Sequence, residues 1–441
     1  MRNCRFIYYI LLCLCISCYD DSGFNEDNNK AKFEPADHTP YEDTSNFVKY
    51  YSGDSVSSIQ IGPNIFEITT FMVFSKHKEL RPYYCYPSVA ITSKGTILHT
   101  CSNLQILADV GEMDVLLARK EKDTETWEIK RIFQTDSVKG RAMCPALVVD
   151  KTTGRIYVFN NYFKKINKFG DDQTYNDAEH VFKYSDDDGM TWSCEYSLKQ
   201  NWDSFCHSFD FISLFNNIQL KNSYESGSLW YKKDNNREIG YINKENIICI
   251  TSGPGGISMD NGTLLIPSYV LLNGISYSSL LIRENGCWRF SRPTPNSGDC
   301  ECTVYLDNYN RIVLDCRTEY TTRTKYYYNI DMDVYTEAES SKIGSFVRVS
   351  TEIVNDDGLF YMCYPSSLKN ERKDLTFYGS KDGINWKKIF LIKTSEPSSY
   401  GYSSIALYNK KLLISYESPE GIIIHDLSPC RDAIRNSILN N

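Results

Sequence analysis

Two kinds of pattern are missing from the 441-residue chain, and each absence argues against a class of function. Beyond residue 18 the sequence contains no Cys-x2-Cys pair, and no His-Glu-x2-His run occurs anywhere in it, so nothing in the body of the chain predicts a zinc site. It contains no basic tract, and its net charge of −8 argues against a nucleic-acid partner. We therefore expect neither a zinc site nor a nucleic-acid partner.

The apolar run at the N-terminus is too short to cross a bilayer as a helix. It covers residues 6–16 and follows two arginines, an order typical of a secretory signal peptide. Residues 14–18 read Leu-Cys-Ile-Ser-Cys and loosely resemble a bacterial lipoprotein cleavage site, with Cys18 as the lipid-bearing residue. We expect residues 1–18 to be a signal segment, followed either by lipidation of Cys18 or by plain secretion.

The segments on either side of the predicted domain are expected to be a tether and a tail. Residues 19–60 begin with an Asn- and acid-rich stretch that is poor in apolar side chains, which predicts a disordered tether. Residues 431–441 are expected to be a C-terminal tail.

Twelve of the 16 cysteines lie between Cys85 and Cys430. An even number permits disulfides in an exported protein without defining their pairing, and we expect most of these cysteines to be small core residues.

A short turn followed at once by β-forming residues occurs six times along the chain. The turn positions are Gly95, Gly154, Gly262, Asn310, Gly358 and Lys410. They are spaced by 59, 108, 48, 48 and 52 residues, so one interval is double and the others share a period near 50. Strands at this period, without a helical pattern, predict the blades of a β-propeller. We predict an all-β fold, a six-bladed β-propeller over residues 61–430.

A second repeat, the Asp-box hairpin, supports this fold. Residues 185–192 read Ser-Asp-Asp-Asp-Gly-Met-Thr-Trp, a complete Asp box, and residues 380–386 contain a shorter copy. Worn copies lie at residues 122–127 and 284–288. In such a turn the Asp carboxylate accepts backbone N–H bonds and Gly takes positive φ, so these copies are predicted to join the outer strands of blades. The double interval contains an insertion at about residues 193–252, predicted to be long loops or an elaborated blade.

Three motifs follow one another along the predicted propeller. They are Gly253-Pro254-Gly255-Gly256-Ile257 before Gly262–Pro267, then Glu301–Leu306 before Leu314–Arg317, then Gly401-Tyr402-Ser403-Ser404 before Leu413–Glu417. In this order, in an exported propeller with Asp boxes, they resemble the sialidase (neuraminidase) family. The resemblance extends from about Phe71 to Pro429.

The resemblance implies a retaining glycosidase with a tyrosine nucleophile. Sialic acid carries a carboxylate on its anomeric carbon, which would repel an Asp or Glu nucleophile, and sialidases use Tyr instead. Tyr402 matches this nucleophile, and Glu301 matches the residue that takes its phenol proton. Asp109 matches the general acid and base, with Glu112 and Asp114 as rivals nearby.

The carboxylate-binding arginines are only partly present. Arg317 and Arg372 match two of the three guanidinium groups that hold the substrate carboxylate in the family. Cys85, in the run Tyr-Cys-Tyr-Pro, stands where the third Arg is expected, whereas Glu417, which would brace that Arg, is present. Loss of one partner of a buried charge pair costs on the order of 2–5 kcal/mol. That corresponds to a loss of roughly 30-fold to a few thousand-fold in activity.

Three interpretations of Cys85 follow. Arg81 or a lysine from another loop replaces the missing guanidinium, or the substrate differs from ordinary sialic acid, or catalysis is largely lost while a glycan-binding pocket remains.

The function predicted first is therefore an exo-α-sialidase that acts on sialylated glycans and, as the resemblance implies, needs no cofactor and no metal. We expect it to be monomeric, and either secreted or held at the cell surface by a lipid anchor. The alternative is a sialidase-like glycan-binding protein without turnover. A third and weaker hypothesis is a propeller scaffold for protein contacts, in which Arg317 and Arg372 do not converge on one pocket.

Overall fold

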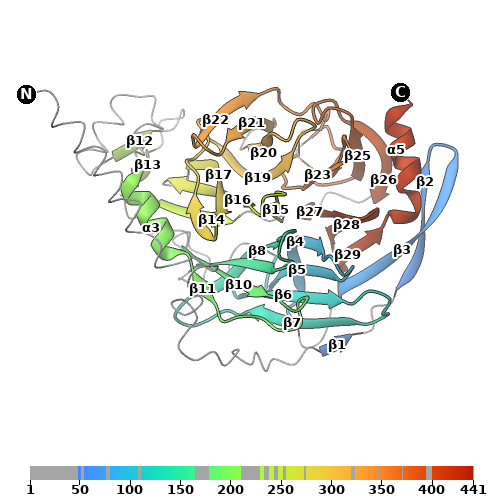
Figure 1. The fold of residues 1–441 in the computed structure, drawn as a ribbon, viewed down its shortest axis with the longest axis horizontal. Helices are drawn as coiled ribbons and strands as arrows, with labels where there is room; N and C mark the ends of the chain where they lie inside the picture. The colour runs from blue at the N-terminus through green and yellow to red at the C-terminus, as the bar shows by residue number, and fades with distance from the viewer. Residues whose placement is uncertain are drawn as a thin grey trace, which may run out of the picture.

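The structure is a computed structural model in which most of the chain is arranged as sheets around a common centre (Figure 1). It describes residues 48–50, 54–75, 80–107, 111–163, 178–209, 229–232, 238–242, 247–251, 255–272, 275–318, 323–345, 347–369, 371–393 and 400–440. Six sheets follow one another around the ring, and a separate two-stranded sheet belongs to the insertion. The prediction of an all-β, six-bladed β-propeller is confirmed.

Each blade is an antiparallel sheet whose strands follow chain order from the inside of the ring outward, except that strands from before residue 80 form the outer edges of the first and last blades (Figure 1). Blade 1 contains β4 (Tyr83–Ile91), β5 (Ile97–Leu104), β6 (Met113–Lys120) and β7 (Trp127–Phe133), with β1 (Val48–Tyr50) outside β7. Blade 2 contains β8 (Arg141–Val149), β9 (Ile156–Phe163), β10 (Ala178–Ser185) and β11 (Tyr196–Ser197). Blade 3 contains β14 (Ile247–Thr251) and β15 (Ile257–Ser258), both paired with β16 (Leu264–Leu272), then β17 (Ile275–Glu284) and β18 (Cys287–Phe290).

The remaining blades follow the same order. Blade 4 contains β19 (Asp299–Leu306), β20 (Ile312–Thr318), β21 (Arg323–Asn329) and β22 (Val334–Ala338). Blade 5 contains β23 (Ile353–Asp356), β24 (Leu359–Pro365), β25 (Leu375–Ser380) and β26 (Lys387–Lys393). Blade 6 contains β27 (Ser403–Tyr408), β28 (Lys411–Ser418), β29 (Gly421–Asp426), β3 (Asn64–Ser75) and β2 (Ser55–Ile61).

Blade 6 closes the ring by joining the two ends of the propeller. Strand β29 pairs antiparallel with β3, so that Ile424 lies opposite Phe71 and Asp426 opposite Thr69. Three strands from the C-terminal part and two from the N-terminal part thus share one sheet. The backbone hydrogen bonds of that sheet fix the N-terminal strands to the last blade, so the two ends of the propeller are held together and the ring is closed.

The six turn repeats all connect the first and second strands of their blades. All six turn residues have positive φ, between 58° at Asn310 and 87° at Gly95. Glycine occupies four of these positions because it adopts this conformation without a Cβ clash. Lys410, with φ of 71°, adopts the same conformation despite its side chain. The period that the sequence shows is thus one left-handed turn residue per blade.

The Asp boxes join the third and fourth strands, as predicted. In the complete copy, Asp187 accepts a hydrogen bond of 2.8 Å from the backbone N–H of Thr191. The Trp192 indole N–H donates to the Gly189 carbonyl at 3.0 Å. In the shorter copy, burial alone would raise the pKa of Asp382, but hydrogen bonds from Asn385, Ile384 and Ser380 outweigh it and lower that pKa to about 2.

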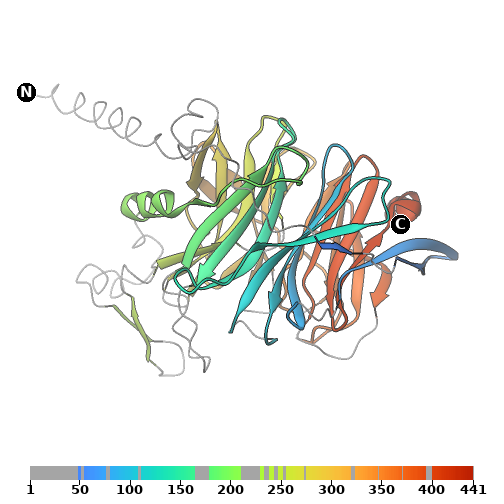
Figure 2. The same ribbon diagram turned by 90° about the horizontal axis from the view of Figure 1, so that it is seen from below.

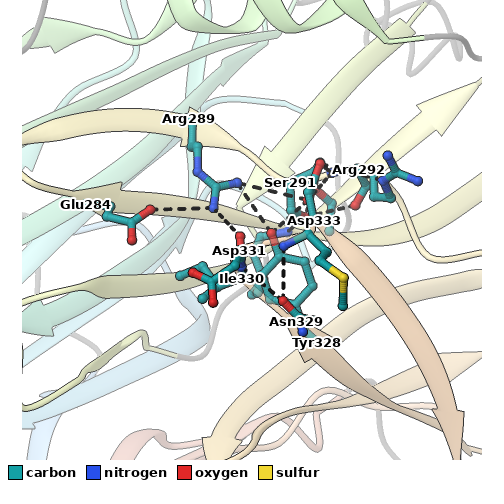
Figure 3. Close-up of polar contacts among 12 residues, drawn as sticks. Glu284, Arg289, Ser291, Arg292, Tyr328, Asn329, Ile330, Asp331 and Asp333 are labelled. Carbon is teal, nitrogen blue, oxygen red and sulfur yellow. Dashed lines mark hydrogen bonds and ion pairs between the residues drawn. The ribbon is translucent and has the colours of Figure 1, made fainter.

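A polar cluster ties the outer strands of blades 3 and 4 together (Figure 3). From β18, Arg289 donates to the Ile330 carbonyl at 3.1 Å and to the Tyr328 hydroxyl at 3.4 Å. The Tyr328 hydroxyl in turn donates to Asp333 at 2.7 Å, and Asp333 accepts the backbone N–H of Arg292 at 3.1 Å. These contacts lie at the rim of the ring, away from the inner strands.

The insertion between blades 2 and 3 contributes helix α3 (Lys199–Ser208) and the hairpin of β12 (Leu229–Lys232) and β13 (Glu238–Ile242). The indole of Trp202 packs edge-on against Phe290, with 5.1 Å between ring centroids. The Asn201 amide donates to the Trp288 carbonyl at 2.9 Å. Helix α3 therefore covers the outer edge of blade 3, and Figure 2 shows it on the opposite side of the ring from the C-terminus.

The segment expected to be a C-terminal tail, residues 431–441, contains helix α5 (Arg431–Leu439), which directly follows the 3-10 helix η4 (Ser428–Cys430). Arg431 and Arg435 of α5 both bond Asp356, at 2.9 Å and 3.1 Å between nitrogen and carboxylate oxygen. The buried side chain of Ile438 packs on blade 5. No helix in the described part of the chain is long and apolar enough to cross a membrane.

Gly379 gives a test of this helix packing. A Cβ atom at residue 379 would lie 2.2 Å from Cδ1 of Ile438, far inside contact distance. We expect Gly379→Ala to lower the free energy of unfolding by about 1–3 kcal/mol, because overpacking forces the helix to shift. Denaturant titration measures this. In the Ile438→Ala background the same change should cost less, and an equal cost in both backgrounds would contradict the assigned contact.

Candidate active site

The chain direction in each blade brings particular segments to one end of the ring. Strands alternate in direction, so the start of a first strand, the end of a second strand and the start of a third strand meet at the same end. Glu301 lies near the start of β19, Tyr402 directly precedes β27, and Arg317 lies near the end of β20. Arg372 lies in the loop between β24 and β25.

Tyr402, Glu301 and Arg317 form one hydrogen-bonded group, although two of them are 101 residues apart in sequence. The Tyr402 hydroxyl donates to the Glu301 carboxylate, with 2.8 Å to each carboxylate oxygen. One guanidinium nitrogen of Arg317, Nη1, donates to the Tyr402 hydroxyl at 2.7 Å and also bonds Glu301. Tyr402 is 8% exposed. The Tyr402 phenol is therefore in direct contact with both a proton acceptor, Glu301, and a positive charge, Arg317.

The electrostatics of this group keep the phenol protonated at rest. Burial and the nearby charge of Glu301 raise the pKa of Tyr402 well above its usual value, while Arg317 and Arg372 oppose that rise. Burial disfavours the charge of Arg317, but Glu301 and Tyr402 outweigh it and raise the pKa of the guanidinium. Tyr402 can therefore react only if its proton moves away as it attacks, and Glu301 is placed to take it.

Arg372 approaches the phenol ring from another side. Its guanidinium carbon lies 5.1 Å from the centroid of the Tyr402 ring. One of its guanidinium nitrogens donates to the Arg348 carbonyl at 3.3 Å. The side chain also packs against Gly401, where an added Cβ would lie 3.2 Å from two Arg372 carbons. Both Arg317 and Arg372 thus reach the phenol, and the scaffold hypothesis, which has them on separate surfaces, is wrong.

Bulges near the start of the inner strands turn side chains into this space. In β19 the regular pairing with β20 is interrupted between Asp299 and Cys302, which leaves Glu301 out of register. In β4 the pairing is interrupted between Cys85 and Ser88, and Tyr86 within the bulge has a φ of 59°. A bulge re-aims a side chain in this way at the end of a sheet.

Glu417 contacts the backbone of Tyr402 and of its neighbours. One carboxylate oxygen, Oε2, accepts the N–H groups of Gly401 at 2.8 Å and Tyr402 at 3.1 Å. The other, Oε1, accepts the N–H group of Tyr86 at 2.8 Å. Burial raises the pKa of Glu417 to about 7, although these three bonds act in the opposite direction.

Cys85 is buried in an apolar cluster. Its neighbours include Leu104, Met143 and Tyr400. Arg81 does not take the place of the missing arginine, because its guanidinium bonds Glu112 at 2.7 Å and Asp114 at 3.3 Å. The suggestion that Arg81 reaches into the site is therefore wrong: two carboxylates on its own blade hold it.

Asp109 lies outside the described residues, as does Cys18. Leu107, two positions before Asp109, packs against the cluster that contains Cys85. The two rival carboxylates have other partners. Glu112 pairs with Arg81, and Asp114 accepts the backbone N–H of Thr135 at 2.8 Å.

The residue that sequence reasoning missed is Tyr86. Its ring packs edge-on against Tyr402, with 5.2 Å between centroids. Its place next to Cys85, in the run where the family has its first arginine, was the available signal. Within the part of the chain described, no group of three or more His, Cys, Asp or Glu side chains is arranged to hold a metal ion.

The fold and the repeats define the class of protein: a six-bladed β-propeller with Asp boxes and a Tyr–Glu–Arg group at one end of its ring. A family model described as "BNR repeat-like domain" matches residues 215–414. The sialidase of Clostridium perfringens is 24% identical to this chain over 381 residues, which covers 79% of this chain and 89% of that protein.

Solved sialidases have a similar fold. The Hadza microbial sialidase Hz136 aligns with a TM-score of 0.61 at 17% identity, over 82% of this chain and 69% of the other. Trypanosoma rangeli sialidase in complex with 2,3-difluorosialic acid, as a covalent intermediate, aligns with a TM-score of 0.61 at 15% identity, over 87% of this chain and 59% of the other. These comparisons bear out the resemblance to sialidases, and the solved structures share the propeller fold of this chain.

Proposed function

We propose that the protein is an exo-α-sialidase, which hydrolyses terminal sialic acids of glycoconjugates and retains the anomeric configuration. One observation carries the proposal, namely the 2.8 Å contact between the Tyr402 hydroxyl and the Glu301 carboxylate, with Arg317 on both groups. The sequence similarity to curated sialidases supports it.

In the first step, Tyr402 attacks the anomeric carbon. The bond between its hydroxyl oxygen and that carbon forms, the glycosidic bond breaks, and the phenol proton passes to Glu301. A neutral phenol suits this substrate because the carboxylate on the anomeric carbon would repel an anionic nucleophile. Arg317 donates to the phenol oxygen and stabilises the negative charge that develops on it.

The substrate carboxylate is assigned to Arg317 and Arg372. Arg317 contacts the Tyr402 hydroxyl and Arg372 lies beside the Tyr402 ring. Both guanidinium groups are therefore near the phenol oxygen, to which the anomeric carbon must bond. Arginine suits this role because its planar group binds a carboxylate through two parallel hydrogen bonds. Position 85 supplies no third guanidinium, so the site holds the carboxylate with two.

Asp109 is assigned to the general acid that protonates the leaving oxygen, and then to the base that activates water. The family resemblance carries this assignment. The two rival carboxylates, Glu112 and Asp114, are each engaged elsewhere, with Arg81 and with the backbone N–H of Thr135.

Hydrolysis of a fluorogenic α-sialoside by the purified protein tests the proposed function. We expect release of the fluorophore, with the α-anomer of free sialic acid as the first product seen by proton NMR. A β-anomer as first product would contradict the Tyr402 mechanism. Tight binding of the sialoside without product would instead establish the glycan-binding alternative.

Cys85→Arg measures the cost of the missing guanidinium. A carboxylate has about four lone-pair positions, and three of those on Glu417 are taken by N–H groups, so one is left for an arginine. We expect kcat/KM to rise by roughly 30-fold or more, mainly through a lower KM. Cys85→Ser is the matched control and should change kcat/KM little. If both variants behave alike, position 85 does not contribute to substrate binding.

We also propose that the protein is exported and attached to a membrane surface through a lipid on Cys18. The lipoprotein-like residues 14–18 support this proposal. Growth of producing cells with an alkyne-tagged fatty acid should label the wild-type protein and leave Cys18→Ala unlabelled. An unlabelled wild-type protein in the medium would show plain secretion instead.

A further inference from the structure

Two buried carboxyl groups accept hydrogen bonds from residues 401–405, the segment that contains Tyr402 and the start of strand β27. Glu417 accepts the N–H groups of Gly401 and Tyr402. Glu352 accepts the hydroxyl of Ser404 at 2.6 Å and the N–H of Ile405 at 3.1 Å. Four of the five residues from 401 to 405 therefore donate to one of these carboxyl groups.

Glu417 differs from Glu352 in what it joins. Its second oxygen binds the N–H of Tyr86, whose ring packs on the ring of Tyr402. It thus links β4 of blade 1 to the segment before β27 of blade 6, at the point where the two tyrosines meet. Glu352 contacts β27 two residues further on and reaches neither tyrosine by a hydrogen bond.

This arrangement replaces an ion pair. The resemblance pairs Glu417 with an arginine at position 85, but that position holds a buried cysteine. Within the described residues, Glu417 forms no ion pair at contact distance, and backbone N–H groups take its oxygens instead. A buried carboxylate without a cation is costly unless hydrogen bonds satisfy it, and here three do so.

We propose that Glu417 is a positioning residue for the nucleophile, which holds the backbone of Tyr402 and the ring of Tyr86 in register through three N–H bonds. This role rests on the proposed function. It differs from binding of the substrate, because Glu417 acts on the chain beneath the phenol. A displacement of about 1 Å at a reacting group can cost about 100-fold in rate.

The arrangement has a consequence for pH. The ionised carboxylate accepts all three N–H groups best, since a proton on Oε1 makes that oxygen a much weaker acceptor for the N–H of Tyr86. The pKa of Glu417 is raised to about 7 by burial. Arg372 faces Glu417 and favours its charge, while Cys101 of β5 and Tyr400 also lie close to it. We therefore expect kcat to fall as the pH is lowered through about 7.

The experiment compares Glu417→Gln with Glu352→Gln, each of which removes one buried carboxyl group that holds β27. Hydrolysis of the fluorogenic sialoside is measured from pH 5 to pH 9. For Glu417→Gln we expect kcat to fall by about 10- to 100-fold with little change in KM, and the acidic limb near pH 7 to disappear. Glu352→Gln should keep the wild-type kcat and the acidic limb. Equal losses in both variants, or a change confined to KM, would overturn the proposal.

A second measurement stands apart from catalysis. In protein labelled with ring-13C tyrosine, the Tyr402 signal is assigned by its loss in Tyr402→Phe. We expect this signal to shift between pH 6 and pH 8 in the wild-type protein and to stay unchanged in Glu417→Gln. If the wild-type signal does not respond to pH, the positioning role is wrong even for an active enzyme. If the signal responds but no sialoside is hydrolysed, only the proposed function fails.

Discussion

Replacing Tyr402 with phenylalanine is expected to lower kcat for sialoside hydrolysis by about 10⁴-fold or more, the scale seen when a nucleophile is removed. The phenol oxygen is the atom that bonds Glu301 and Arg317, and the substitution deletes it while the ring remains against Tyr86 and Arg372. KM should change little, because the two arginines still hold the carboxylate. Steady-state kinetics with a fluorogenic sialoside measure both constants.

Tyr305→Phe is the matched control for this substitution. Tyr305 is also a buried tyrosine and lies on β19, the strand that carries Glu301, but its ring packs in the core of blade 4 and blade 5. Loss of the Tyr305 hydroxyl should leave kcat within about threefold of wild type, as expected for a substitution in the core away from the site. Tyr402→Phe at wild-type activity would reject the nucleophile assignment.

Replacing Arg317 with methionine is expected to lower kcat/KM by roughly 30-fold to a few thousand-fold. Arg317 pairs with Glu301 and donates to Tyr402, so its removal leaves a carboxylate with 15% side-chain exposure without its cation. Breaking one partner of a buried charge pair costs on the order of 2–5 kcal/mol. KM should rise because the substrate carboxylate loses one of two guanidinium groups, and kcat should fall because the phenol loses its donor.

Arg289→Met provides the comparison for a loss of charge away from the site. Arg289 takes part in the polar cluster between blades 3 and 4, at the rim of the ring (Figure 3). Its removal should leave both kinetic constants near their wild-type values. An Arg317→Met enzyme with unchanged KM and reduced kcat would mean that Arg317 serves the phenol and not the substrate carboxylate.

The parts of the fold that depend on local geometry could be predicted from the sequence. Each blade needs a left-handed turn residue after its first strand, and the repeat of Gly or Asn at five of these positions, with Lys410 at the sixth, indicated six blades. The Asp box is equally local, since Asp187 and Thr191 bond each other within one turn. Helix α5 was missed because residues 431–439 become a helix on blade 5 through partners far away in sequence, such as Asp356.

The site could be predicted only where a residue type is tied to one role. Tyr402 and Glu301 follow from the resemblance to sialidases, and the structure places them in contact. The partners of Arg81 depend on the register of β4, β5 and β6, which no local pattern reveals. The same is true of Glu417, whose three N–H partners come from two blades and include Tyr86.

The central claim is that Tyr402 forms a covalent bond with the sugar, and trapping that intermediate tests it most directly. The purified protein is incubated with 2,3-difluorosialic acid, the compound present as a covalent intermediate in the Trypanosoma rangeli structure. Mass spectrometry of proteolytic peptides should find one sugar attached to Tyr402, and none in Tyr402→Phe. Hydrolytic activity together with an adduct on Glu301, or on any residue other than Tyr402, would contradict the account.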